Sequence, residues 1–168
     1  MRDFQTEFED FMKVLEGHSQ SLPFAFSKFP IDHACYRMAT QKDYKEICTE
    51  FEKLSSEIVN APHHNRKFHI FVLREPITYK GTKVSCIEVS EPGGSDNYPT
   101  GFQHIEFLTN LDLQKVVAKN KDLEPFIFTG KFGDEVYLKW PDKLALKFTA
   151  TPVLEKSQNK EGAEIIKK

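Results

Sequence analysis

The chain repeats one order of predicted elements, and this repeat is the feature that most limits its possible folds. Residues 31–38 (IDHACYRM) and residues 102–109 (FQHIEFLT) are alternating segments that share a His at their third position. A predicted helix and at least two further predicted strands follow each of them. Near the end of each repeat, CIEV and ALKF can be matched so that Glu88 corresponds to Lys147. Such a repeat indicates one small unit present in two copies.

Hydrophobic periodicity gives approximate bounds for these elements, because alternation predicts strands and spacings of three or four residues predict helices. The stretch EPGGSDNYPTG, residues 91–101, is rich in Pro, Gly and Ser and predicts the linker between the two copies. The predicted strands are residues 31–38, 67–74, 82–89, 102–108, 126–128, 135–140 and 144–150, and the predicted helices are residues 3–17, 40–58 and 113–120.

With 168 residues, the chain is expected to form one domain with a sizeable core. Hydrophobic residues make up 39% of it, with 15 Phe among them, which excludes a disordered chain. The tail after Pro152 is charged and lacks a sustained apolar pattern, which predicts disorder. The expected domain is residues 1–151, comprising an N-terminal helix and loop (1–30), a first module (31–90) and a second module (102–151), followed by a disordered tail (152–168).

Charge and cysteine content limit the partners and the compartment. Lys and Arg number 23 and Asp and Glu 25, so the net charge of −2 argues against nucleic-acid binding. The three cysteines have no CxxC spacing, which favours reduced thiols and a cytoplasmic protein. The start of the chain does not have the pattern of a secretory signal, and no apolar run approaches the 20 or so residues of a membrane span, so we expect no membrane partner.

Two histidines and one carboxylate are the candidate metal ligands. If both copies curl into half-barrels, His33, Glu88 and His104 would converge on one interior. Two imidazoles and a carboxylate suit a divalent transition metal, and three protein ligands leave open positions, as in a catalytic site. The alternative is that each His is an ordinary core or surface residue.

Three further charged residues are predicted to face the same interior. Glu106 shares a strand face with His104 and is a candidate general base, an outer partner of a His, or a member of a buried ion pair. Arg37 would either clamp a substrate carboxylate or neutralise a neighbouring Glu. Lys147 would either bind an anion or form an ion pair.

The remaining histidines and several other residues are predicted to be structural. His63 and His64 lie in a predicted loop, where consecutive side chains point apart, so we expect them to be solvated. His69 could face the same interior, but a structural role is the expectation. Packing roles are predicted for Cys35, Cys86 and Trp140.

The segments DHACYR, LREP, IEV, YPTGFQHIEF and LKF together resemble the YecM-like proteins of the vicinal oxygen chelate superfamily, which includes glyoxalases, bleomycin resistance proteins and extradiol dioxygenases. The resemblance extends to about Thr151. It implies an α+β fold in which paired βαβββ modules form a cupped, barrel-like sheet, here with an extra N-terminal helix. It also implies His33, Glu88 and His104 as metal ligands. In glyoxalase-type members the fourth ligand position is a carboxylate on the last strand, where this chain has Lys147.

The resemblance implies a divalent-metal-dependent enzyme that acts on a small oxygen-rich substrate. The reaction classes it suggests are those of an isomerase, an epimerase, a lyase or an oxidoreductase, the last including dioxygenase-like chemistry. The metal would be Zn, Ni, Fe, Mn or Co, and the protein a monomer or a homodimer. A second hypothesis is a non-catalytic protein that binds a small molecule, or a metal, in the same cup. A third is a protein-interaction scaffold that uses the Phe-rich first helix.

Overall fold

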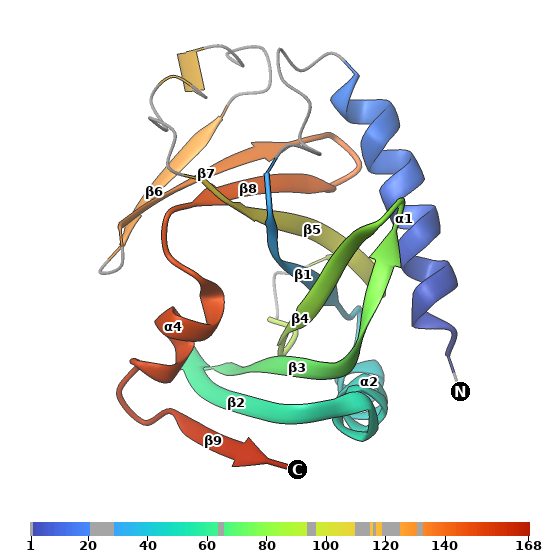
Figure 1. Ribbon diagram of the computed structural model, residues 1–168, viewed down its shortest axis with the longest axis vertical. Coiled ribbons are helices and arrows are strands. Elements are labelled where there is room, and N and C mark those ends of the chain that lie inside the picture. The colour runs from blue at the N-terminus through green and yellow to red at the C-terminus, as the bar shows by residue number, and fades with distance from the viewer. Residues whose placement is uncertain are drawn as a thin grey trace.

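One curved sheet dominates the computed structural model, which describes residues 2–20, 29–63, 66–93, 97–109, 115, 117–118, 125–130 and 133–168. Within these residues nine strands follow the order β6-β7-β8-β5-β1-β4-β3-β2-β9 (Figure 1). No helix among them has the length and apolarity that a membrane span requires. The elements are α1 (Phe4–Ser19), β1 (Ile31–Arg37), α2 (Gln41–Leu54), β2 (Ser55–His63), β3 (Arg66–Tyr79), β4 (Thr82–Ser90), β5 (Gly101–Leu108), β6 (Phe126–Gly130), β7 (Gly133–Lys139), β8 (Ala145–Thr149), α4 (Val153–Gln158) and β9 (Glu164–Lys167).

The sequence repeat reappears in the strand pairing. β1 pairs in parallel with β4, and β5 pairs in parallel with β8. The two first strands, β1 and β5, run antiparallel to each other and join the two halves. Cys35 lies opposite Glu88 in the first half and Glu106 lies opposite Lys147 in the second, so the sequence match of Glu88 with Lys147 has the correct register. The predicted α+β fold with a cupped sheet and an N-terminal helix is confirmed.

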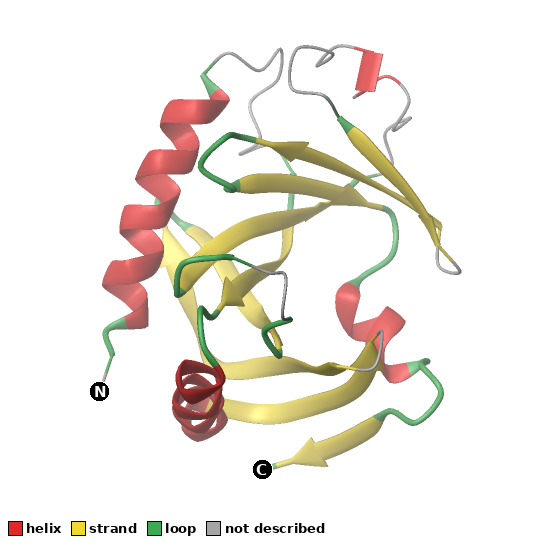
Figure 2. Ribbon diagram, turned by 180° about the vertical axis from the view of Figure 1, so that it is seen from behind, coloured by secondary structure: helices red, strands yellow, loops and turns green. Residues whose placement is uncertain are grey.

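The sheet has an outer face, which carries α1 and α2, and an inner face, which we call the cup (Figure 2). Residues opposite one another on neighbouring strands project to the same face. One such row runs across the cup and contains His104, Cys35, Glu88, Ile70 and Val59. The cup is therefore polar at the central strands and apolar at β3 and β2.

α1 is part of the hydrophobic core. Asp3 caps its start by accepting a hydrogen bond from the Thr6 amide, as the sequence predicted. Phe8 contacts Phe102 edge-on, and Phe4 stacks on Phe51 with ring centroids 4.2 Å apart. The apolar stripe is buried throughout, at Phe4, Phe8, Phe11, Met12 and Leu15. The Phe side chains are thus used inside the molecule, which removes the support for an interaction scaffold built on this helix.

The end of α2 differs from the prediction. The helix starts after Thr40, which caps the Asp43 amide as expected, but it ends at Leu54 and not near Ile58. Residues 55–63 form β2, a strand that periodicity missed, paired antiparallel with β3. Ile58 and Val59 are both buried there. β-branched residues favour a strand when a partner strand is present, and that partner lies later in the chain.

The tail was expected to be disordered, and this prediction is wrong. Residues 153–158 form α4, and residues 164–167 form β9, which extends the sheet beside β2. Val153 and Lys156 of this segment are buried. Elements of six and four residues are too short to show periodicity, so tertiary contacts, not the local pattern, hold them in place. The helix predicted at residues 113–120 falls largely outside the described residues.

Replacing Phe8 with Ala tests whether α1 is integral to the core. Because Phe8 is fully buried, we expect Phe8→Ala to lower the free energy of unfolding by about 3–5 kcal/mol. Val14 lies on the exposed side of the same helix, and Val14→Ala should change the free energy of unfolding by less than about 0.5 kcal/mol. Urea unfolding measures both values. Equal effects of the two substitutions would show that α1 is peripheral.

Candidate metal centre

Three adjacent strands bring the predicted ligands together. His33 comes from β1, Glu88 from β4 and His104 from β5, and the order β5-β1-β4 makes these strands neighbours. One ligand atom from each side chain lies within 4.8 Å of the other two. All three side chains are almost completely buried. The geometry therefore groups the two imidazoles and the carboxylate in the cup.

His104 offers a ring nitrogen in the state that a metal requires. Its Nδ1 donates a 2.5 Å hydrogen bond to Oε1 of Gln103, whose amide is oriented by donation to the Lys143 carbonyl. Nε2 of the neutral ring then carries a lone pair. This atom is buried and is without a hydrogen-bond partner among the described residues. Burial, followed by the positive charge of Lys147, lowers the pKa of His104 well below its usual value and keeps the ring neutral.

His33 is surrounded by carboxylates. Nδ1 lies 2.8 Å from Oδ2 of Asp32, and Nε2 lies 3.2 Å from Oε2 of Glu88 and 3.6 Å from Oε2 of Glu106. Burial opposes the imidazolium, but the charge of Glu106 and the hydrogen bonds to Asp32 and Glu88 outweigh it and raise the pKa of His33 to about 9. Without a metal, the ring donates from both nitrogens.

Each histidine is oriented by the residue before it in the chain. Asp32 holds Nδ1 of His33, and Gln103 holds Nδ1 of His104, so both rings direct Nε2 inward. A hydrogen-bonded Nδ1 fixes the ring and its tautomer for ligation through Nε2. The sequence analysis did not assign these two roles. The acceptor-His dipeptides, DH and QH at matching positions of the repeat, were the available signal.

Glu88 is tied to the opposite strand. Its Oε1 accepts from Cys35 Sγ at 3.3 Å and from Arg37 Nη2 at 3.4 Å. Burial opposes ionisation, but the His33 hydrogen bond and the Arg37 charge hold the pKa of Glu88 well below its usual range. Arg37 also donates to Ser90 Oγ. Glu88 is thus a carboxylate in the folded protein, and Cys35 does more than fill the core.

A ring of four charges fills the other half of the cup. Lys147 Nζ lies 2.5 Å from Glu106 and 3.3 Å from Glu135, while Lys156 Nζ lies 3.0 Å from Glu106 and 2.6 Å from Glu135. Each lysine therefore bridges both carboxylates. Burial opposes ionisation of Glu106, yet the charges of Lys147, His33 and Lys156 lower its pKa to about 2. We call these four residues the ion ring.

The ion ring changes how the remaining predicted residues can act. A carboxylate with a pKa near 2 is a weak base at neutral pH, so Glu106 is better suited to balancing charge beside His33. Of the two predicted roles of Lys147, anion binding and ion pairing, the structure shows the ion pair, with Glu106. Lys147 occupies the position in the second module that matches Glu88 in the first. The sequence analysis missed Glu135 and Lys156. Lys156 was overlooked because it lies in the segment predicted to be disordered.

The donor set in the cup fits a divalent transition metal. Nε2 of His104 is a buried acceptor that lacks a partner among the described residues. The side chains of His33, Glu88 and His104 each offer one ligand atom within 4.8 Å of the other two. Imidazole and carboxylate donors suit zinc, nickel, iron, cobalt and manganese. His33, Glu88 and His104 would hold the ion, with Asp32 and Gln103 as outer partners.

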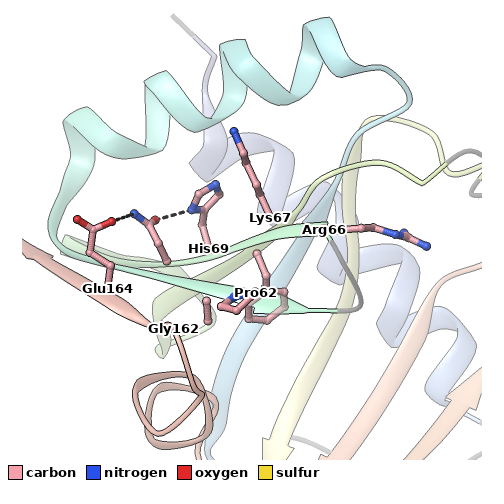
Figure 3. Close-up of a pocket in the computed structure, with 9 residues that line it drawn as sticks. Pro62, Arg66, Lys67, His69, Gly162 and Glu164 are labelled. Carbon is pink, nitrogen blue, oxygen red and sulfur yellow. Dashed lines mark hydrogen bonds between the residues drawn. The ribbon is translucent and has the colours of Figure 1, made fainter.

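His69 lies outside the cup, at a surface hollow of about 340 Å³ beside β2, β3 and β9 (Figure 3). Its Nδ1 donates to Asn60 Oδ1 at 2.6 Å, and its Nε2 accepts from the Tyr44 hydroxyl at 2.5 Å. Asn60 donates in turn to Glu164 of β9. Burial, then the charge of Lys67, lowers the pKa of His69. The chain of hydrogen bonds links α2 to the sheet edge, which is a structural role. The side chains of His63 and His64 fall outside the described residues.

Comparison with known proteins assigns the chain to a family. A family model described as YecM protein matches residues 1–150, so the chain belongs to the YecM family, as its motifs indicated. The solved structure of the structural-genomics target "Protein EC4020" is similar over 95% of this chain and 92% of that one, with a TM-score of 0.79 and 18% identity. At that identity the likeness supports the fold alone. No curated protein matches the chain.

Two further solved structures are similar at a lower level. A xylose isomerase-like TIM barrel/4-hydroxyphenylpyruvate dioxygenase fusion protein is 12% identical, with a TM-score of 0.44; 96% of this chain and 27% of that chain are covered. A mutant of the fosfomycin resistance protein FosX from Listeria monocytogenes, complexed with Mn(II), is 14% identical, with a TM-score of 0.28 and coverage of 74% and 94%. These TM-scores are too low to support an argument about this chain.

The environment of His33 predicts how the stability of the metal-free protein depends on pH. Its pKa is raised in the fold, so protonated His33 stabilises the protein fully below about pH 6.5, and this contribution is lost as the pH rises through about 9. The shift corresponds to roughly 3 kcal/mol. We expect the stability difference between wild type and His33→Gln, measured by urea unfolding with a chelator present, to shrink between pH 6 and pH 10. A difference that is constant over this range would contradict the charge assignment.

Proposed function

We propose that the protein binds one divalent metal ion in the cup through His33, Glu88 and His104, and acts through it on a small oxygen-rich molecule. The observation that carries this proposal is the buried Nε2 of His104, which lacks a hydrogen-bond partner among the described residues, in a side chain that offers a ligand atom within 4.8 Å of ligand atoms of His33 and Glu88. An unsatisfied buried polar atom is costly, and a metal would remove that cost. The bound ion would act as a Lewis acid toward substrate oxygen atoms.

The charges around the cup favour an anionic ligand. Glu88 pairs with Arg37, and the two acidic members of the ion ring are balanced by its two lysines. Of the carboxylates around the cup in the described part of the chain, only Asp32 then remains to balance the two positive charges of a bound metal ion. One positive charge of the ion is therefore uncompensated. Buried charge must be paired. A monoanion with two neighbouring oxygens, such as a 2-hydroxy acid or a 2-oxo acid, would supply both the chelating atoms and the charge.

Arg37 is the side chain we assign to the anionic end of the ligand. Its guanidinium donates to Glu88 and lies 5.8 Å from the ring centroid of Tyr98, which belongs to the segment that joins the two modules. About a quarter of its side chain is exposed, unlike those of the three ligands, so it lies between the metal site and solvent. Arg37 would orient a carboxylate while Lys147 fixes Glu106 beside His33.

The second candidate function is ligand binding without chemistry in the same cup. The observation that favours it is the ion ring, which lowers the pKa of Glu106 to about 2 and makes this side chain a poor proton acceptor. The two functions differ in what happens to the ligand. Incubation of the metal-loaded protein with 2-hydroxy and 2-oxo acids, followed by NMR of the mixture, separates isomerisation, hydrogen exchange at carbon and simple binding.

Metal titration tests the proposed site. We expect wild type to bind one Zn²⁺ per chain in calorimetry. Glu88→Gln or His104→Gln should abolish tight binding, because each removes a ligand. Asp32→Asn should weaken binding by about 10–100-fold, because it replaces the outer carboxylate that holds Nδ1 of His33 with a neutral amide and keeps all three ligands.

His69→Gln is the matched control, because His69 is a partly buried strand histidine outside the cup. It should leave both the affinity and the stoichiometry unchanged. Equal loss of Zn²⁺ binding in His69→Gln and His104→Gln, or no Zn²⁺ bound by folded wild-type protein, would refute the proposed site.

A further inference from the structure

The inner face of the sheet changes from polar to apolar in one row of neighbouring residues. Glu88 lies opposite Ile70, and Ile70 lies opposite Val59. The next row places Phe68 opposite Ala61. These four apolar side chains are buried and form a cluster separate from the main core. A continuous surface thus leads from the candidate metal ligands to an apolar floor on β3 and β2.

α4 covers this apolar floor. Val153 is buried in the cluster, and Leu154 and Ala163 pack against it. In Figure 1, α4 lies inside the curve of the sheet, between the half that contains β8 and the half that contains β2. The apolar part of the cup is therefore filled by the chain's own C-terminal segment. The three candidate ligands are at most 5% exposed beside it.

Two of the polar contacts made by α4 lead to His33. The Val153 amide donates to Oδ2 of Asp32 at 2.8 Å, the same oxygen that holds Nδ1 of His33. Lys156 Nζ lies 3.0 Å from Glu106, which approaches the other ring nitrogen of His33. The first turn of α4 and the candidate metal ligands thus share their hydrogen-bond partners. Movement of α4 would alter both sides of His33.

The C-terminal segment that covers the apolar floor consists of short elements. α4 has six residues and β9 has four, and all four residues of β9 are exposed. The residues matched by the YecM family model end at 150, before α4 begins. Short elements with few buried side chains open at a lower free energy than the core strands.

From this juxtaposition we infer that α4 is a displaceable cover that occupies an amphipathic ligand site. When α4 leaves, the floor of Val59, Phe68 and Ile70 is open beside the metal ligands. The site would take a molecule with two metal-chelating oxygens at one end and an apolar body of several carbons at the other. This ligand class rests on the proposed function, whereas the displacement of α4 does not.

The native cysteines report whether the cup opens. Cys35 is completely buried in the cup, while Cys48 is partly buried on α2, outside it. We would label the protein with methyl methanethiosulfonate and follow each cysteine by mass spectrometry. Lys156→Met removes the charge that holds α4 and keeps the apolar stem. We expect it to accelerate labelling of Cys35 at least tenfold and to leave Cys48 within twofold.

A second variant loosens the other contact. Val153→Pro removes the amide that donates to Asp32, and proline is well tolerated at the first position of a helix. It should also accelerate labelling of Cys35. Lys167→Met, the same change at an exposed residue of β9, is the matched control and should have no effect. The inference that α4 is a displaceable cover would be refuted if the labelling rate of Cys35 were unchanged in both Lys156→Met and Val153→Pro. It would also be refuted if the labelling rate of Cys48 rose by the same factor.

Addition of Zn²⁺ separates this inference from the proposed function. Cys35 Sγ donates to Glu88, so a metal held by Glu88 should slow labelling of Cys35 in the Lys156→Met protein. If the variants open the cup but Zn²⁺ leaves the rate unchanged, the metal site is wrong and the cover stands. If Zn²⁺ protects Cys35 but the variants do not open the cup, the cover is wrong and the metal site stands.

A homologous series of ligands tests the apolar floor. With Zn²⁺ bound to the Lys156→Met protein, we would measure protection of Cys35 by 2-hydroxybutanoate, 2-hydroxyhexanoate and 2-hydroxyoctanoate. Burial of each added methylene should tighten binding about fourfold. Affinity that does not change with chain length would refute the apolar part of the ligand class.

Discussion

The antiparallel register of β1 and β5 is the constraint on which the candidate site depends. It places His33 opposite Glu106 and Cys35 opposite His104, so residues from the two modules meet on one face. A shift of this register by one residue would turn the side chains of one strand to the outer face, toward α1. The parallel partners β4 and β8 then add Glu88 on one side and Lys147 on the other. The positions of the candidate metal ligands and of Glu106 and Lys147 in the ion ring therefore depend on this one strand pair.

Equivalent positions in the two halves of the cup make different contacts. In the first half, Cys35 donates to Glu88, a candidate metal ligand; in the second, Glu106 and Lys147 form an ion pair. A buried ion pair is stable only when its other hydrogen-bonding atoms are also satisfied. Glu135 and Lys156 add further contacts to both members of the pair by completing the ring. The first half thus offers a candidate metal ligand where the second half has a member of the ion ring.

Much of the fold and part of the candidate site were predictable from the sequence. The other elements and residues depend on contacts between distant parts of the chain, which a local sequence pattern does not contain. The repeat predicted the two-module sheet. The matching positions of His33 and His104 within it predicted that their side chains would lie close together in one interior. Periodicity failed at residues 55–63 because β2 becomes a strand only beside β3. It failed again at α4, whose six residues are held by contacts with Asp32 and the ion ring. The ion-pair role of Lys147 was one of two alternatives, and only the position of Glu106 favours it.

The central position of β1 also has a consequence for how the chain reaches its fold. β1 pairs on one edge with β4 and on the other with β5, and both partners are synthesised long after it. Contacts between distant parts of a chain form slowly, because the entropy of closing the intervening loop is lost first. Until β5 arrives, the first module presents a bare strand edge with its backbone groups unpaired. The same edge would be open to the β1 strand of another copy until β5 covers it, so the antiparallel joint inside one molecule also protects the completed chain from pairing with its neighbours.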